Sequence, residues 1–220
     1  MTDLRKLNRW LGGGALAAAG ALGTIVYVPA VLAFPHRAQF GEITVYSVSP
    51  IGPEMPAILD RAAKRNAMSA IAAPLGPRSV YLTDGGWRWS LLSLPTSHGA
   101  FAVTRPFSMN IVVNRTSIAG DGVENSAAIG NRRTLSGTIA HETTHLLIHQ
   151  RYGLAARTFA TWKVEGYCDH VAQESSLSDA QAAALRAAGK STPGLVYHDA
   201  RRKVAAALAS GKSVDQLFRN

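Results

Sequence analysis

Cysteine is almost absent from this sequence, because Cys168 is the only one. No intrachain disulfide can form, which fits a reducing compartment or an exported domain that does without disulfides. Cys168 lies near the candidate site described below. We expect it to be a buried, inert thiol rather than a ligand or a nucleophile.

Acidic residues are also few: 14 Asp and Glu stand against 23 Lys and Arg, which gives a formal net charge of +9. The basic residues are scattered, with close clusters only at 132–133 and 201–203. They do not alternate with aromatic residues as they do in nucleic-acid-binding modules, so no nucleic-acid partner is predicted. A solvated face, or weak attraction to an anionic membrane, explains the charge.

Charged residues are missing altogether from 10–34, and Arg5, Lys6 and Arg9 precede this run. About 20 apolar residues span a bilayer. The preceding basic cluster predicts that the N-terminus stays inside and the rest of the chain lies outside. We therefore predict a cytoplasmic segment at 1–9, a transmembrane signal anchor at 10–34 and one domain at 35–220, on the periplasmic or extracellular side of the cell membrane. The alternative is a signal peptide cleaved after the small residues near Ala33, which gives a secreted protein.

The first half of the domain reads as strands with one helix, after a linker at 35–41. The helix is predicted at 54–73, and 84–86 (DGG) indicates a hairpin turn. A loop rich in Gly, Ser and Asn follows at 115–131. The predicted strands are 42–48, 79–83, 87–92, 100–104 and 109–114.

The second half reads as helices. Capping-box patterns at Ser178 and Ser213 indicate two helix starts, and Gly153 stands where a helix end is expected. The predicted helices are 134–151, 161–174, one from 178 to about 189, 197–209 and a short last one from 213. Strands followed by helices indicate an α+β fold, with a small strand-rich N-terminal lobe and a helical C-terminal lobe.

The sequence HETTH at 141–145 is the motif around which the site is organised. On a helix it puts His141 and His145 on one face, where two neutral imidazoles can hold one zinc ion. Glu142 can then act as general base towards water. His149 continues the same face, but a further turn displaces it about 6 Å along the axis. We therefore assign it to packing, or to a contact with a ligand, rather than to the metal.

A catalytic zinc site needs a third protein ligand. Glu165 lies on the next predicted helix, which a loop at 152–160 allows to return alongside the first. Asp169, four residues on, shares its helix face. Glu165 can complete the ligand set, while Asp169 can accept the outer N–H of a ligating imidazole, most plausibly that of His141.

HETTH at 141–145 followed by EGYCD at 165–169 resembles the gluzincin metallopeptidases, of which thermolysin is the type member. The resemblance covers about 134–174. It implies a zincin-like fold, zinc ligands His141, His145 and Glu165, Glu142 as general base and acid, and Asp169 as the partner of a ligand. The spacing between His145 and Glu165 is short, which is typical of a compact member.

The family also uses a Tyr or His to stabilise the oxyanion of the tetrahedral intermediate. Tyr197 is the first candidate for this role, and the others are His198, Tyr152 and Tyr167. Arg201, one helical turn from Tyr197, could bind a substrate carbonyl or carboxylate.

The resemblance further implies an edge strand before the motif helix that pairs with extended substrate. The segment 109–113, which includes Asn110, is placed for this role. The function predicted is zinc-dependent hydrolysis of peptide bonds in a peptide or protein substrate. The alternative is a non-catalytic, membrane-anchored zinc domain that binds a protein partner.

Overall fold

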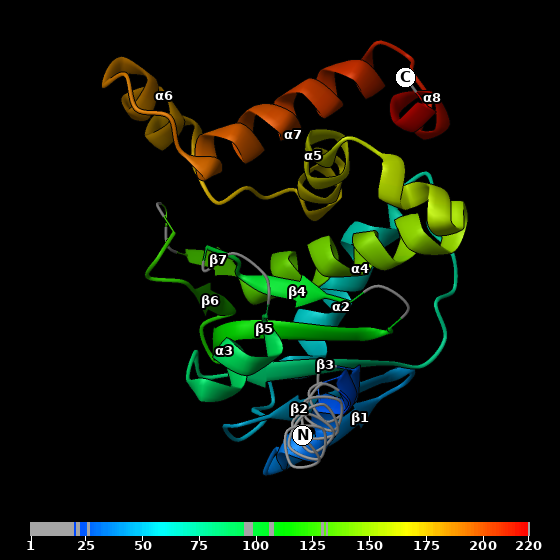
Figure 1. Ribbon diagram of the computed structural model, residues 1–220, viewed down its shortest axis with the longest axis vertical. Coiled ribbons are helices and arrows are strands. Elements are labelled where there is room, and N and C mark those ends of the chain that lie inside the picture. The colour runs from blue at the N-terminus through cyan, green and yellow to red at the C-terminus, as the bar shows by residue number, and fades with distance from the viewer. Residues whose placement is uncertain are drawn as a thin grey trace, which may run out of the picture.

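The computed structural model describes residues 20, 23–25, 27–94, 99–105, 108–128, 130 and 132–219 (Figure 1). A strand-rich first half is followed by a helical second half, so the predicted α+β class is confirmed. The strands are β1 (His36–Phe40), β2 (Ile43–Ser47), β3 (Arg78–Thr83), β4 (Ala102–Thr104), β5 (Asn110–Ser117), β6 (Gly122–Glu124) and β7 (Arg132–Thr134). The helices are η1 (Pro29–Leu32), α2 (Met55–Ala67), α3 (Trp87–Leu92), α4 (Leu135–Tyr152), η2 (Gly153–Thr158), α5 (Thr161–Ala172), α6 (Asp179–Ala187), α7 (Pro193–Ala209) and α8 (Val214–Arg219).

All seven strands form one mixed sheet in the order β1-β2-β3-β5-β6-β7, with β4 also paired to β5. The centre is parallel, from β2 through β3 to β5. The strands β1, β4, β6 and β7 add antiparallel pairs around it. Gly41 adopts a positive φ of 55° in the tight turn between β1 and β2, where glycine carries no steric penalty.

Alternation along the central strands gives the sheet two apolar faces. Val80 and Ile111 belong to the core under α2 and α4. Their neighbours Tyr81 and Val112 point the other way and pack with residues of α3 and η1. The sheet is therefore covered on both sides, and α4 lies on the side that carries the larger core.

The helical half is layered on α4. In Figure 1, α5 lies between α4 and α7, and Gly166 lets α5 approach α7 closely. A Cβ at Gly166 would lie only 2.6 Å from the Ala200 carbonyl oxygen. The C-terminal helix α8 returns to the end of α4, where Arg151 and Tyr152 bind Asp215.

Several local predictions were wrong, including the loop expected at 115–131, which contains the end of β5 and all of β6. The segment 87–92 is a helix, because Trp89 and Leu92, three residues apart, are the ones that turn inward. The turn at 84–86 therefore opens α3 instead of joining a hairpin. The expected linker at 35–41 contains β1, which pairs along its whole length with β2.

The strand at 109–113 was predicted to be an edge, and this too is wrong. β5 is hydrogen-bonded to β3 on one side and to β4 on the other, so its backbone cannot take a further strand there. Asn110 donates from its side chain to the Tyr27 carbonyl oxygen at 2.8 Å. Within the described residues, β4 pairs with β5 alone, which makes β4 the edge strand next to α4.

Residues 1–9 and most of the predicted anchor at 10–34 lie outside the described residues. Within the part that the structure does describe, none of the helices combines the length and apolar character needed to cross a membrane.

Candidate metal centre

The helix α4 supplies two imidazoles from one face. Thr134 begins the helix, because its side-chain oxygen accepts a hydrogen bond from the Gly137 N–H at 3.0 Å. His141 and His145 follow one turn apart, and their Nε2 atoms lie 3.2 Å from each other. Almost the whole first part of α4 is buried, since the sheet, α2 and α5 surround it. The two rings are therefore held in place by packing.

The helix α5 brings Glu165 to the same point. Its carboxylate oxygens lie 3.3 Å from His141 Nε2 and 3.6 Å from His145 Nε2. Burial opposes ionisation of this carboxyl, but the nearby imidazoles outweigh it and lower the pKa of Glu165. The structure thus brings together the three side chains that were predicted to bind the metal.

Cys168 is a further donor in this cluster. Its Sγ and the ring nitrogens of His141 and His145 lie within 4.8 Å of one another, which is compatible with a bound metal ion. Burial, followed by the charge of Glu165, raises the pKa of the Cys168 thiol well above its ordinary value. A thiol binds metals as the thiolate, so this shift disfavours Cys168 as a ligand. Cys168 is buried, as predicted.

Two buried charged side chains, Asp169 and Arg133, follow His141 in a hydrogen-bonded row. One oxygen of Asp169 lies 2.7 Å from His141 Nδ1 and also accepts from Arg133 Nη2 at 2.8 Å. Burial works against the charged His141 ring, but Asp169 outweighs it and raises the pKa of His141 to about 10. Burial likewise opposes the ionised Asp169, yet Arg133 holds the pKa of that carboxyl below its usual value.

Arg133 was missed at the sequence level, where it formed part of an apparently solvated pair with Arg132. In β7 the two alternate, so Arg132 is exposed while Arg133 is buried. Strand alternation just before the motif helix was the signal that could have found it.

Glu142 points away from this row of charged side chains and towards β4. Its Oε2 accepts a hydrogen bond from Thr104 Oγ1 at 2.6 Å, and the carboxylate is buried. Thr104 was also missed, because no sequence signal links the end of an early strand to a residue 38 positions later. The edge strand β4 therefore contacts Glu142, the candidate base, through Thr104.

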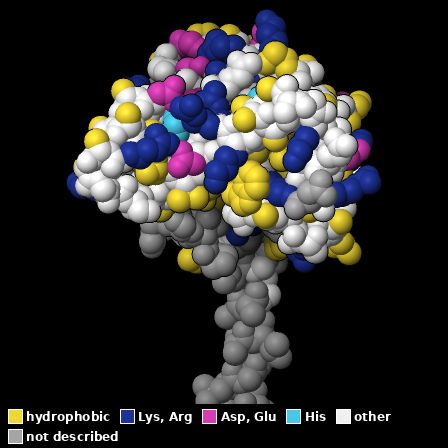
Figure 2. All heavy atoms as spheres, turned by 90° about the horizontal axis from the view of Figure 1, so that it is seen from above, with side chains coloured by type: hydrophobic (Ala, Val, Ile, Leu, Met, Phe, Trp, Pro, Cys, Tyr) yellow, Lys and Arg dark blue, Asp and Glu magenta, His cyan; other side chains and the backbone are white. Residues whose placement is uncertain are grey.

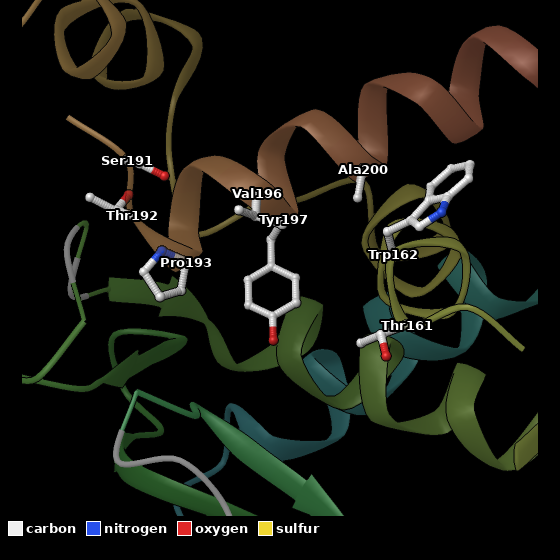
Figure 3. A pocket seen from close by; sticks show the side chains of 8 residues that line it. All are labelled: Thr161, Trp162, Ser191, Thr192, Pro193, Val196, Tyr197 and Ala200. Atoms are coloured by element: carbon white, nitrogen blue, oxygen red, sulfur yellow. The ribbon is translucent and has the colours of Figure 1, made fainter. Parts of the chain in front are cut away.

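Tyr197 faces the cluster from α7. Figure 3 shows its side chain pointing from α7 towards α4, beside an apolar cavity. Burial, then the charges of Glu165 and Asp169, raise the pKa of the Tyr197 hydroxyl, which places it within electrostatic reach of both carboxylates. The cavity has a volume of about 510 Å³ and is lined by Thr161, Trp162, Ser191, Thr192, Pro193, Val196, Tyr197 and Ala200.

The other candidates for the oxyanion role have partners elsewhere. His198 is buried and binds Asp179 at 2.8 Å. The Tyr152 hydroxyl donates to Asp215 at 2.6 Å. The Tyr167 hydroxyl lies 2.8 Å from Ser69 Oγ. These contacts leave Tyr197 as the first candidate.

Two further residues were considered at the sequence level. Burial, followed by the neighbouring His145, lowers the pKa of His149, in keeping with a place one turn beyond the cluster. Burial, followed by the charge of Arg201, lowers the pKa of His170 on α5. The contact of Arg201 with substrate stays a prediction.

Searches of protein-family models, of curated proteins and of solved structures found no match to this chain.

Proposed function

We propose that the chain is a zinc metallopeptidase of zincin-like fold, held at a membrane by its N-terminal apolar run. The observation that carries the proposal is the spacing of three donors. The two Nε2 atoms of His141 and His145 lie 3.2 Å apart, and the two carboxylate oxygens of Glu165 reach one ring each, with Oε2 at 3.3 Å from His141 and Oε1 at 3.6 Å from His145. Ligands at about 2.0–2.2 Å from a tetrahedral zinc ion lie roughly 3.3–3.6 Å apart. Two imidazoles and one carboxylate, with a fourth position left for water, are a donor set typical of catalytic zinc.

The chemistry that zinc supplies in such sites is Lewis-acid activation of the attacking water and of the scissile carbonyl. Glu142 takes the proton of that water and passes it to the leaving nitrogen. Thr104 orients the Glu142 carboxylate through their 2.6 Å hydrogen bond. Asp169 holds the His141 ring so that Nε2 faces Glu165.

Substrate binding involves β4 and α7. The edge of β4 that pairs with no other described strand offers backbone groups to an extended peptide, which gives affinity without sequence preference. Tyr197 donates its hydroxyl hydrogen to the oxygen that gains negative charge. The apolar cavity beside it accepts an apolar substrate side chain.

A zinc domain that only binds a partner gives no reason for a buried carboxylate next to the donors and oriented by Thr104. That carboxylate is what supports hydrolysis over the non-catalytic alternative.

The test is Glu142→Gln in the full chain. We expect zinc content to stay at wild-type level while hydrolysis of a mixed peptide library falls by about 10²–10⁴-fold, the usual contribution of a general base. Zinc is measured by metal analysis after metal-replete purification. Glu124→Gln, which changes an exposed carboxylate on β6, is the matched control and should keep activity.

Wild-type activity should also disappear with a chelator and return with zinc. Full activity in Glu142→Gln would refute the proposed mechanism. A wild-type protein that binds no zinc would refute the metal site itself.

A further inference from the structure

The chain enters the fold without a spacer. Residues 20, 23–25 and 27 are helical, η1 follows at Pro29–Leu32, and β1 begins at His36. The predicted membrane run extends to residue 34, so its last part belongs to the folded body. If the predicted anchor is helical from Trp10 to Tyr27, it would reach roughly 27 Å, close to the ~30 Å hydrocarbon thickness of a bilayer.

This entry point is fixed to the sheet. Arg88 donates from Nε to the Leu32 carbonyl oxygen at 3.2 Å and from Nη2 to that of Ala33 at 3.3 Å. The Phe34 ring packs against Tyr81 with 5.3 Å between ring centroids. These contacts fix η1, and with it the protein surface next to Tyr27, against α3 and the sheet.

Large apolar side chains are exposed around this entry point. We call them the η1–α3 face, and they are Tyr27, Val28, Val31, Trp87 and Leu94. Trp87 is 59% exposed although it lies next to the apolar cluster that α3 covers. The guanidinium of Arg88 stands 4.6 Å from the centre of its ring. An exposed tryptophan beside a cation, among apolar side chains, is a combination suited to the interface between lipid and water.

Basic charge accompanies the apolar side chains. Arg105 donates to the Leu92 carbonyl oxygen, which places its guanidinium at the end of α3. On the face that Figure 2 shows, basic side chains are scattered among polar and apolar ones instead of gathering in one patch.

We propose that the η1–α3 face lies on the surface of an anionic bilayer, with Trp87 and Val31 at the level of the lipid headgroups. The inference rests on the proposed membrane anchor, since an anchor without a spacer brings this face against the lipid. Arg88 and Arg105 complement anionic headgroups.

The same contact brings the candidate site close to the membrane. Thr104, which contacts Glu142, and Arg105, which binds the Leu92 carbonyl oxygen of α3, are neighbours at the end of β4. The β4 edge therefore adjoins the lipid-facing surface, and the peptide segments within its reach are those close to a membrane.

The test uses tryptophan fluorescence of the full chain in vesicles of phosphatidylcholine and phosphatidylglycerol. Brominated phosphatidylcholine quenches tryptophans in contact with lipid. Trp87→Phe is compared with Trp162→Phe, because Trp162 is also exposed, at 40%, but lies beside the cavity on α5. Trp10, in the proposed anchor, contributes equally to both variants.

We expect Trp87→Phe to lower the quenched fraction of the emission and Trp162→Phe to raise it, since the second change removes emission that lipid does not reach. An unchanged quenched fraction in Trp87→Phe would overturn the proposal. If that variant still floats with the vesicles, the anchor stands and only the contact of this face is refuted. A wild-type chain that fails to float would overturn both. Neither outcome depends on hydrolysis, so the proposed enzyme activity is judged separately.

Discussion

One carboxylate oxygen organises the candidate site at the level of single residues. Asp169 Oδ1 binds both His141 Nδ1 and Arg133 Nη2. A proton on Nδ1 leaves the lone pair of His141 on Nε2, which faces His145 and Glu165. Arg133 compensates the buried charge of Asp169 and so keeps this arrangement in place.

Replacing Arg133 by Met should therefore weaken the site. Asp169 would remain buried without its cation, which typically costs about 3–5 kcal/mol of folding free energy. Loss of such a supporting contact typically lowers metal affinity about 10–100-fold. Denaturant unfolding measures the first effect, and competition with a chromophoric chelator, on folded protein, measures the second.

Arg132→Met is the matched control, because it removes an exposed arginine from the same strand. Arg133→Lys keeps the charge without the guanidinium fork, so it should fall between wild type and Arg133→Met. Equal zinc affinity in Arg133→Met and Arg132→Met would show that Arg133 does not position the ligand.

At the scale of elements, the helix α5 completes the candidate site, because it packs between α4 and α7. It carries Glu165 and Asp169 on the side of α4, and Gly166 on the side of α7. A Cβ at Gly166 would lie 2.7 Å from the Ala200 carbonyl carbon and 3.0 Å from Val204 Cγ2. The first contact is with backbone, so a side chain can be accepted only if one of the two helices moves.

Gly166→Ala should therefore destabilise the protein. Helix propensity alone would favour Ala over Gly by about 1 kcal/mol, but overpacking typically costs about 1–3 kcal/mol. A net loss in the free energy of unfolding, together with lower zinc affinity, is expected because α5 also positions Glu165. Ala206→Val, at an exposed position of α7, controls for added volume. A stabilised Gly166→Ala protein would contradict the close packing.

Local signals explain which elements could be predicted from the sequence. The box at Ser178 forms as expected, with hydrogen bonds in both directions to Gln181, and the one at Ser213 does the same with Gln216. The segment 87–92 was assigned wrongly because a short apolar run fits a strand and a helix equally well. Only contact with the sheet decides between them.

The difference between local sequence signals and long-range contacts also decides which residues of the candidate site could be predicted. Glu165 and Asp169 could be found because they follow the motif at helical spacing. Thr104 and Arg133 could not, because sheet register brings them to α4 from β4 and β7. The edge role of β4 depends likewise on which strands flank β5, and the order of strands along the chain does not reveal that.

At the scale of the whole molecule, the C-terminus closes back on the motif helix. Asp215 lies in the first turn of α8 and binds the end of α4 through Arg151 Nη2 at 2.8 Å and the Tyr152 hydroxyl at 2.6 Å. The phenylalanines Phe159 and Phe218 stack beside this contact, with 4.8 Å between ring centroids. Phe159, which follows η2, and Phe218, which belongs to α8, thus pack in one apolar cluster.

This contact predicts a loss of stability in acid. The hydrogen bonds from Arg151, then that from Tyr152, lower the pKa of Asp215 from 3.8 to about 2. Because the pKa is lower in the folded state, the stabilisation is fully present above pH 3.8 and is lost as the pH falls through about 2. Wild type should therefore exceed Asp215→Asn in free energy of unfolding at pH 5, and the difference should shrink towards pH 2.

Asp60→Asn separates this effect from a general change of charge. It removes one carboxylate from an exposed pair with Lys64, and such pairs contribute little to stability. Denaturant titrations of the three proteins across the same pH range give the comparison. The wild-type advantage over Asp215→Asn should depend on pH, while the difference from Asp60→Asn should stay small throughout. If the Asp215→Asn difference were the same at pH 5 and pH 2, the carboxylate would not be what joins α8 to α4.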